Sequence, residues 1–148
     1  MGVERKEEHA FLSEFLKDFK NVNARIMNGI NWDDEAGIQN IIASFDVGIA
    51  TLLDNEFYRS KSAFKLKQYL NAGVPVLSSN LPENNKFIIE GSNGFLCNTS
   101  EELRQRIIQF YEMKGEEYKS FSKNARRCIH NFDLKHFCEK LHSICNLR

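Results

Sequence analysis

Cationic and hydroxyl side chains gather at the start of one predicted helix, where they could bind a phosphate or a diphosphate. The residues are Arg59, Ser60, Lys61, Ser62 and Lys65, and Ser62 is of a type that often caps a helix N-terminus. The unpaired N–H groups at a helix start carry a partial positive charge, which adds to that of the cationic side chains. Together these groups favour an anionic phosphate or diphosphate ligand.

The residues after this loop predict the helix and the strand that position it. Apolar residues recur at helical spacing until Gly73, a typical helix end, and they are Phe64, Leu66, Tyr69 and Leu70. The following segment 74–77 is short, apolar and rich in β-branched residues, as a buried parallel strand requires. The local order is therefore strand, loop, helix, strand.

Upstream, the same two periodicities predict further helices and strands. We expect an amphipathic helix over 3–20, a strand over 22–27, and a helix that begins at Asp33 or Asp34. The buried side of that helix should comprise Ile38, Ile41, Ile42 and Phe45. A strand over 46–50 and an irregular loop over 52–59 should then lead to the helix that begins near Ser62.

Downstream, a polar turn over 78–85 should precede a short helical piece at 87–89 and a last short strand from about Asn93. Helices are then expected from Ser100, over 118–129 after an interruption at Gly115, and over 134–147. Strands that alternate with helices predict a Rossmann-like α/β fold, in which a parallel sheet is flanked by helices and followed by C-terminal helices. Ligands in such folds bind at the carboxyl ends of the strands.

Size and composition favour one ordinary globular domain over residues 1–148. Lys and Arg together equal Asp and Glu, with 20 of each, which argues against nucleic-acid binding through bulk charge. The charged N-terminus lacks the apolar core of a secretory signal, and no apolar run is long enough to cross a membrane, so we expect a cytoplasmic protein.

The four cysteines and the histidines were considered as a metal site. Cys138, His142 and Cys145 share one helical face, but apolar residues share the same helix, and buried cysteine packs as a small hydrophobe. We therefore expect reduced thiols and no metal. A Ser-His-Asp mechanism has no Gly-x-Ser-x-Gly motif to support it, and Asp46 begins its strand, which fits a receiver-like signalling domain poorly.

Three stretches resemble the C-terminal, donor-binding domain of GT-B glycosyltransferases, in the large retaining, nucleotide-sugar-using group known as glycosyl transferases group 1. They are Ile42 to Ile49, with its Asp-Val strand; Lys61 to Val76, with Ala-Gly-Val-Pro-Val; and Ile88 to Leu96, with Asn-Gly-Phe-Leu. The resemblance runs from about Val22 to Phe132 and is strongest over 40–132. It implies half of a GT-B fold.

The resemblance also implies where a nucleotide sugar would bind. The donor loop of the family falls on 58–62, and the backbone at Gly29 and Ile30 matches the place where the family holds the nucleobase. The two positions that are usually acidic carry Ser60 and Gln68. An amide at Gln68 can still bind the ribose hydroxyls, but without the added strength that a carboxylate gives. No catalytic residue is assigned.

The function implied is that of a hexosyltransferase-type enzyme, which moves a sugar from a nucleoside diphosphate to a saccharide or lipid-linked acceptor in cell-surface polysaccharide synthesis. The donor is a substrate, and the scheme requires no cofactor, because cations at the helix start stabilise the leaving diphosphate. Earlier strands and an acceptor domain have no counterpart here, so we expect a fragment that is inactive alone. A homodimer that covers an open sheet edge, and peripheral membrane association of a longer protein, both stay open.

The alternative is a non-catalytic α/β interaction domain that keeps the glycosyltransferase shape. Its support is the neutral character of Ser60 and Gln68 and the Phe-rich N-terminal helix. Sequence leaves the sugar, the base, the acceptor and the choice between retention and inversion undecided.

Overall fold

The computed structural model describes residues 14, 23, 25, 27, 29–129 and 134–145. Its chain divides into two compact units, Met1–Asp34 and Glu35–Arg148. The helix expected over 3–20 lies outside the described residues except at residue 14, which is helical. The strand expected over 22–27 is described only at residues 23, 25 and 27, and none of these three is in a strand. The elements that follow all belong to the second unit.

Within the described residues, three parallel strands form a sheet, as the alternation of strands and helices predicted. They are β1 (Gly48–Ala50), β2 (Val76–Ser79) and β3 (Gly94–Cys97), in the spatial order β1-β2-β3. The register pairs Gly48 with Val76 and Val76 with Gly94. The strands expected over 46–50, over 74–77 and from about Asn93 are therefore confirmed, although β1 and β2 each begin two residues later than their apolar segments.

Helices connect and flank these strands. They are α2 (Glu35–Ala43), α3 (Glu56–Arg59), α4 (Phe64–Ala72), a 3-10 helix at Asn84–Lys86, α5 (Ser100–Glu112), α6 (Gly115–Ile129) and α7 (Leu134–Cys145). Two local expectations were wrong. The loop expected to be irregular contains α3, because the side chain of Asn55 accepts a hydrogen bond from the N–H of Tyr58 and caps it. The helical piece expected at 87–89 lies earlier, at 84–86.

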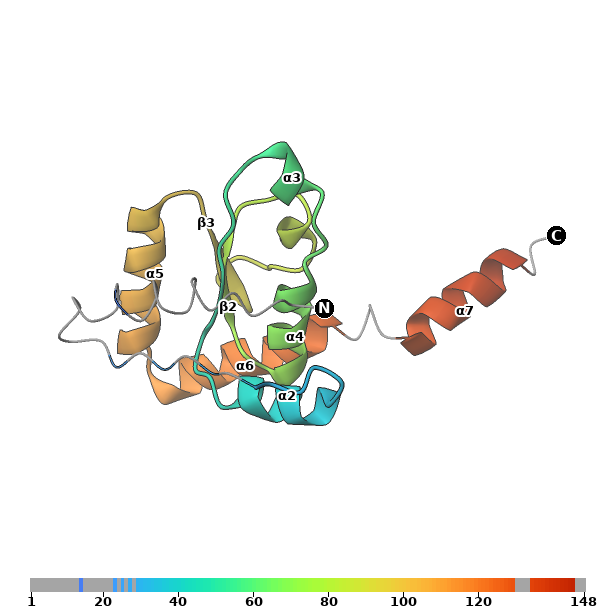
Figure 1. Ribbon diagram of the computed structural model, residues 1–148, viewed down its shortest axis with the longest axis horizontal. Helices are drawn as coiled ribbons and strands as arrows, with labels where there is room; N and C mark the ends of the chain where they lie inside the picture. Colours follow the sequence, from blue (N-terminus) through green and yellow to red (C-terminus); the bar gives the residue numbers. More distant parts are fainter. Residues whose placement is uncertain are drawn as a thin grey trace. The chain divides into compact units, whose positions relative to one another are not determined.

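Helices α4 and α5 lie on opposite sides of the sheet (Figure 1), and buried apolar side chains form a core layer on each face. On the α4 face the buried side chains are Ala63, Leu66, Leu70, Val76, Phe87, Ile88 and Ala125. On the α5 face they are Leu77, Phe95, Phe110 and Phe121. Helix α6 contributes to both layers, and alternate residues of β2 point to opposite faces as the pleat requires.

Helix α4 is fixed by its apolar stripe, but the stripe is narrower than expected. Leu66 and Leu70 are fully buried one turn apart, and Gly73 ends the helix at φ +78° in the left-handed region. Phe64, which was expected to be buried, is 62% exposed because it lies in the first turn, beyond the sheet. On α2, Ile38 and Ile42 are buried as expected, whereas Phe45 follows the helix end and is 38% exposed.

The turn before β3 depends on a buried amide. Asn93 is fully buried, and its side chain donates to the carbonyl of Phe87 and accepts from the N–H of Ile89. The next residue, Gly94, lies so close to β2 that an added Cβ would be 2.2 Å from the carbonyl oxygen of Val76. Side chains larger than hydrogen are therefore excluded at this position.

Replacement of Gly94 by alanine should destabilise the protein strongly, because the backbone of β2 cannot yield to the added methyl group. We expect Gly94→Ala to lower the free energy of unfolding by roughly 2–4 kcal/mol in urea titrations. Gly115→Ala is the matched control, since an added Cβ there meets nothing within 4 Å. Equal stability of the two variants would contradict this account of the β2–β3 contact.

Candidate functional site

A cavity of about 360 Å³ opens at the carboxyl end of β1, where the predicted phosphate-binding loop meets α4. Its volume falls in the usual range for small-molecule sites. The lining residues are Ile49, Ala50, Thr51, Leu52, Lys61, Ser62, Ala63, Phe64, Lys65, Leu66 and Asn84. Three segments, after β1, at the start of α4 and after β2, therefore form one site.

Side-chain hydrogen bonds from the end of β2 hold the loop that follows β1. The Ser79 hydroxyl accepts from the N–H of Leu52 and donates to its carbonyl, both at 2.8 Å. Ser78 donates to the carbonyl of Ala50, and the buried Asn84 side chain donates to the carbonyl of Ser79. These bonds fix the cavity wall without any ligand.

The start of α4 has no side-chain cap, contrary to the expectation for Ser62. The cap residue is Ala63, one position later, and the carbonyl of Ser62 accepts the N–H of Phe64 at 2.8 Å. Among the described residues, the N–H groups of Lys65 and Leu66 have no hydrogen-bond partner. Two backbone donors at the positive end of the helix thus lie in residues that line the cavity.

Arg59, a predicted site residue, binds Asp54 and does not face the cavity. Its guanidinium donates to both carboxylate oxygens of Asp54, at 2.5 and 2.9 Å, and it does not line the cavity. The hydrogen bond from Arg59 lowers the pKa of Asp54 and correspondingly raises that of the arginine. The pair is exposed, so it orients α3 rather than adding much stability.

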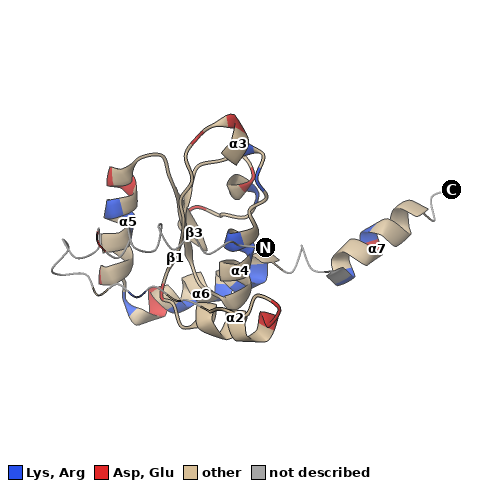
Figure 2. Cartoon of the chain, in the orientation of Figure 1, with Lys and Arg blue, Asp and Glu red and all other residues tan. Residues whose placement is uncertain are grey.

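Lys61 and Lys65 are therefore the cationic side chains that line the cavity. Figure 2 colours the Lys and Arg positions between α3 and α4 and on α4 blue. The Lys61 ammonium lies 4.7 Å from the ring centroid of Phe57 and 5.2 Å from that of Tyr58. Both distances are within the range of cation–π attraction, which orders an exposed lysine without neutralising it. Lys65, in the first turn of α4, is exposed and also lines the cavity.

The remaining predicted site residues lie outside the cavity lining. Ser60 donates its hydroxyl to the carbonyl of Phe57, so it closes the end of α3. Gln68 is half-buried in the second turn of α4. Gly29, at φ +68°, and Ile30 belong to the first compact unit. The roles predicted for these four residues stay predictions.

Of the residues that line the cavity, only Lys61, Ser62 and Lys65 were predicted as site residues. Among those that sequence reasoning missed, Thr51 follows β1, Asn84 follows β2, and Phe64 was placed on the apolar face of the helix. Thr51 and Asn84 had a usable signal, since each comes after a predicted strand and would meet the other at the carboxyl edge of a parallel sheet. No sequence signal placed Phe64 in the cavity wall, because helical spacing does not show which turn of a helix extends past the end of the sheet.

The cysteines lie apart from one another and form no disulfide. Cys97, Cys128, Cys138 and Cys145 are free thiols, and burial raises the pKa of Cys97 and of Cys128. Within the described residues, no group of three or more His, Cys, Asp or Glu side chains is arranged to hold a metal ion. No described helix is both long and apolar enough to span a membrane.

Comparison with known proteins agrees with this architecture. Residues 63–128 match the family model described as "Glycosyl transferases group 1", which confirms the predicted resemblance over those residues. No curated protein sequence matches the chain.

Two solved structures share the fold. The crystal structure of Anabaena Alr3699/HepE in complex with UDP-glucose is 18% identical, with a TM-score of 0.74 over 98% of this chain and 38% of that chain. The crystal structure of Anabaena Alr3699/HepE in complex with UDP and glucose is 17% identical, with a TM-score of 0.73 over 97% and 37%. The present chain thus spans less than two fifths of the length of those structures, and the α/β Rossmann-like fold is confirmed.

The absence of a serine cap on α4 has a measurable consequence. We expect Ser62→Ala to leave the free energy of unfolding nearly unchanged, because this hydroxyl caps nothing. Thr99 does cap α5 by accepting the N–H of Glu102 at 3.1 Å, so Thr99→Ala should cost about 1 kcal/mol. Chemical denaturation of the two variants measures both values, and a larger loss at Ser62 would overturn the assignment of Ala63 as the cap.

Proposed function

We propose that this chain is the nucleotide-sugar-binding part of a glycosyltransferase, which moves a sugar from a nucleoside diphosphate to a saccharide or lipid-linked acceptor. The observation that carries the proposal is the cavity at the carboxyl edge of the sheet, where Lys61, Lys65 and two unpaired helix N–H groups converge. A diphosphate needs distributed positive charge and several donors, and this arrangement offers both.

The family match and the shared fold support this proposal. The matched model covers α4 to α6, and the start of α4 is the part of the chain that contributes most to the cavity. The HepE structures contain UDP-glucose, or UDP and glucose, so this fold can hold such ligands in that protein.

The chemistry follows from where charge develops. As the bond between the sugar and the diphosphate breaks, negative charge grows on the departing oxygen. Fixed N–H groups and the ammonium groups of Lys61 and Lys65 stabilise that charge more than they stabilise the intact donor. Gln68 would bind the ribose hydroxyls, and the backbone at Gly29 and Ile30 would hold the base. The scheme uses no metal ion or cofactor.

Further parts of the proposal concern the whole enzyme. We propose that its donor carries a hexose and that it acts in the cytoplasm in the synthesis of cell-surface polysaccharide. We also propose that polypeptide beyond this chain binds the acceptor, and that this chain by itself does not transfer sugar. Peripheral membrane association of a longer protein is part of the same proposal, since the acceptor is lipid-linked or extends to the surface.

A non-catalytic α/β interaction domain is the second candidate. It is favoured by Ser60 and Gln68, which are neutral where the family usually has acids, and by the hydrogen bond that engages the Ser60 hydroxyl within α3 and its cap. This alternative predicts an assembly whose mass, in light scattering, is the same with and without nucleotide. The leading proposal predicts saturable ligand binding.

Isothermal titration with UDP, UDP-glucose and inorganic pyrophosphate tests the leading proposal directly. We expect all three to bind, and Lys61→Ala or Lys65→Ala to weaken each of them by roughly tenfold, the effect of one lost charge-assisted contact. Lys119→Ala is the matched control, because this exposed lysine pairs with Glu116 on α6, outside the cavity lining.

The controls make a negative result informative. Circular dichroism establishes that each variant is folded. Failure of a folded wild-type chain to bind any of the three ligands, or an equal loss for Lys119→Ala, would refute the assignment of this cavity as a diphosphate site.

A further inference from the structure

The side chain of Asn84 has an unused hydrogen-bond acceptor. This side chain is 5% exposed, and its amide group donates an N–H to the carbonyl of Ser79 at 2.9 Å. Its oxygen, Oδ1, accepts no hydrogen bond from any residue that the structure describes. A buried amide that uses only its donor is uncommon, because an unpaired polar group in the interior costs free energy.

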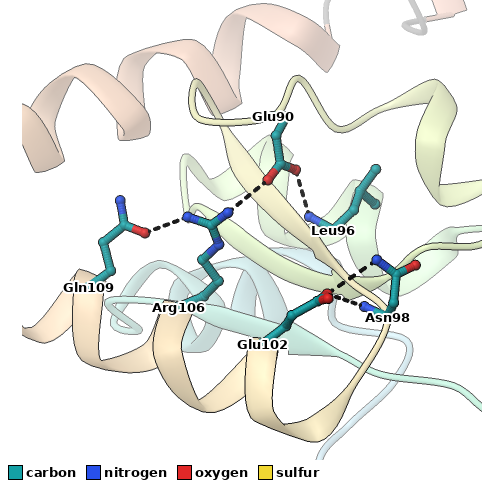
Figure 3. A network of polar contacts seen from close by, with 6 residues as sticks. All are labelled: Glu90, Leu96, Asn98, Glu102, Arg106 and Gln109. Carbon is teal, nitrogen blue, oxygen red and sulfur yellow. Dashed lines mark hydrogen bonds and ion pairs between the residues drawn. The ribbon is translucent and has the colours of Figure 1, made fainter.

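Other polar side chains near the strand ends use their acceptors. Asn93 is the other buried amide among the described residues, and it both donates to the carbonyl of Phe87 and accepts the N–H of Ile89. Figure 3 shows that the carboxylate of Glu90, next to β3, accepts the N–H of Leu96. Asn84 differs from these side chains, because its acceptor is left for something other than the protein.

The free oxygen of Asn84 faces the cavity at the carboxyl end of β1. Asn84 lines this cavity, and in the described part of the chain no fully buried side-chain N or O atom lacks a partner. Oδ1 therefore touches open space, and the open space beside this residue is the cavity. The amide cannot be turned over, since its oxygen would then lie 2.9 Å from the carbonyl oxygen of Ser79.

The middle of the sheet determines the surroundings of this oxygen. Asn84 follows β2, which pairs with β1 on one side and with β3 on the other. The neighbouring parts of the cavity wall are the segment after β1 and the first turn of α4. All of these segments are described, and they lie beside the central strand. The free acceptor is therefore independent of the outer edges of the sheet.

The two kinds of polar group in the cavity suit different parts of a ligand. Lys61, Lys65 and the helix N–H groups are donors, so they bind phosphate oxygens. The oxygen of Asn84 is an acceptor, which an ionised phosphate cannot satisfy but a hydroxyl group can. A ligand that displaces water from this oxygen loses affinity unless it supplies a donor of its own.

We propose that Asn84 is a specificity-determining residue that accepts a hydrogen bond from a hydroxyl of the transferred sugar, whose diphosphate lies at the start of α4. This inference rests on the proposed function, because it requires a nucleotide sugar in the cavity. The volume of about 360 Å³ is in the range for ligands larger than a diphosphate alone. Leu52 and the exposed ring of Phe64 supply apolar walls against which the C–H groups of a sugar can pack.

Isothermal titration with UDP-glucose, and with analogues in which fluorine replaces one sugar hydroxyl at a time, tests this inference. Fluorine is close to a hydroxyl in size but cannot donate a hydrogen bond. We expect the wild-type chain to bind one analogue roughly tenfold or more weakly than UDP-glucose. Asn84→Ala should bind UDP-glucose and that analogue equally, and it should bind inorganic pyrophosphate, which has no sugar, as the wild-type chain does.

Two control variants separate the free oxygen from the cavity wall. Asn85→Ala changes the same residue type at the next position, which is exposed and outside the cavity lining. Ser79→Ala removes the hydroxyl that holds Leu52 but keeps the carbonyl to which Asn84 donates. Both variants should still bind the analogue more weakly than UDP-glucose. Circular dichroism establishes that each variant is folded.

Several results would overturn the inference while pyrophosphate still binds and the diphosphate site stands. They are equal binding of UDP-glucose and every analogue by the wild-type chain, discrimination that survives Asn84→Ala, and loss of discrimination in Asn85→Ala. Weaker pyrophosphate binding by Asn84→Ala, or no binding of UDP-glucose by the wild-type chain, would overturn it too. If the folded wild-type chain binds neither pyrophosphate nor UDP-glucose, the proposed function fails and the inference fails with it.

Discussion

The packing of α4 against β2 is the contact on which the rest of the site depends. Leu66 and Leu70 are fully buried beside Val76, and burial of two leucines contributes about 3–6 kcal/mol relative to exposure. Because α4 is anchored through this stripe, its first turn projects to the carboxyl edge of the sheet. The unpaired N–H groups, Lys61 and Lys65 therefore converge on one cavity.

Small polar side chains then shape that edge. Ser78, Ser79 and Asn84 bind the carbonyl and N–H groups that the strand ends and the following loop would otherwise leave unpaired. A buried unpaired polar group costs free energy, so each bond fixes the loop as well as stabilising it. The cavity wall is thus set before any ligand enters, which limits the reorganisation that binding would require.

Local contacts decide which cationic side chains of this region can bind a ligand. Arg59 forms an ion pair with Asp54, whereas the aromatic rings of Phe57 and Tyr58 order Lys61 without cancelling its charge. Of the three cationic residues close together in the sequence, Arg59 is thus held in an ion pair, and Lys61 and Lys65 line the cavity. Local partners also bind the backbone beside β3, where Glu90 accepts the N–H of Leu96 and Glu102 accepts that of Asn98.

Sequence by itself determined the parallel α/β fold, the three strands, the helix ending at Gly73 and the place of Lys61 and Lys65, because these features follow from local periodicity and short-range turn chemistry. It also supplied the family resemblance that residues 63–128 bear out. Only the tertiary structure decided that Arg59 binds Asp54, that Ala63 rather than Ser62 caps α4, that Phe64 is exposed and that Asn84 joins the cavity. These outcomes depend on where α4 ends relative to the sheet and on which side chains meet across loops, and no spacing along the chain encodes those distances.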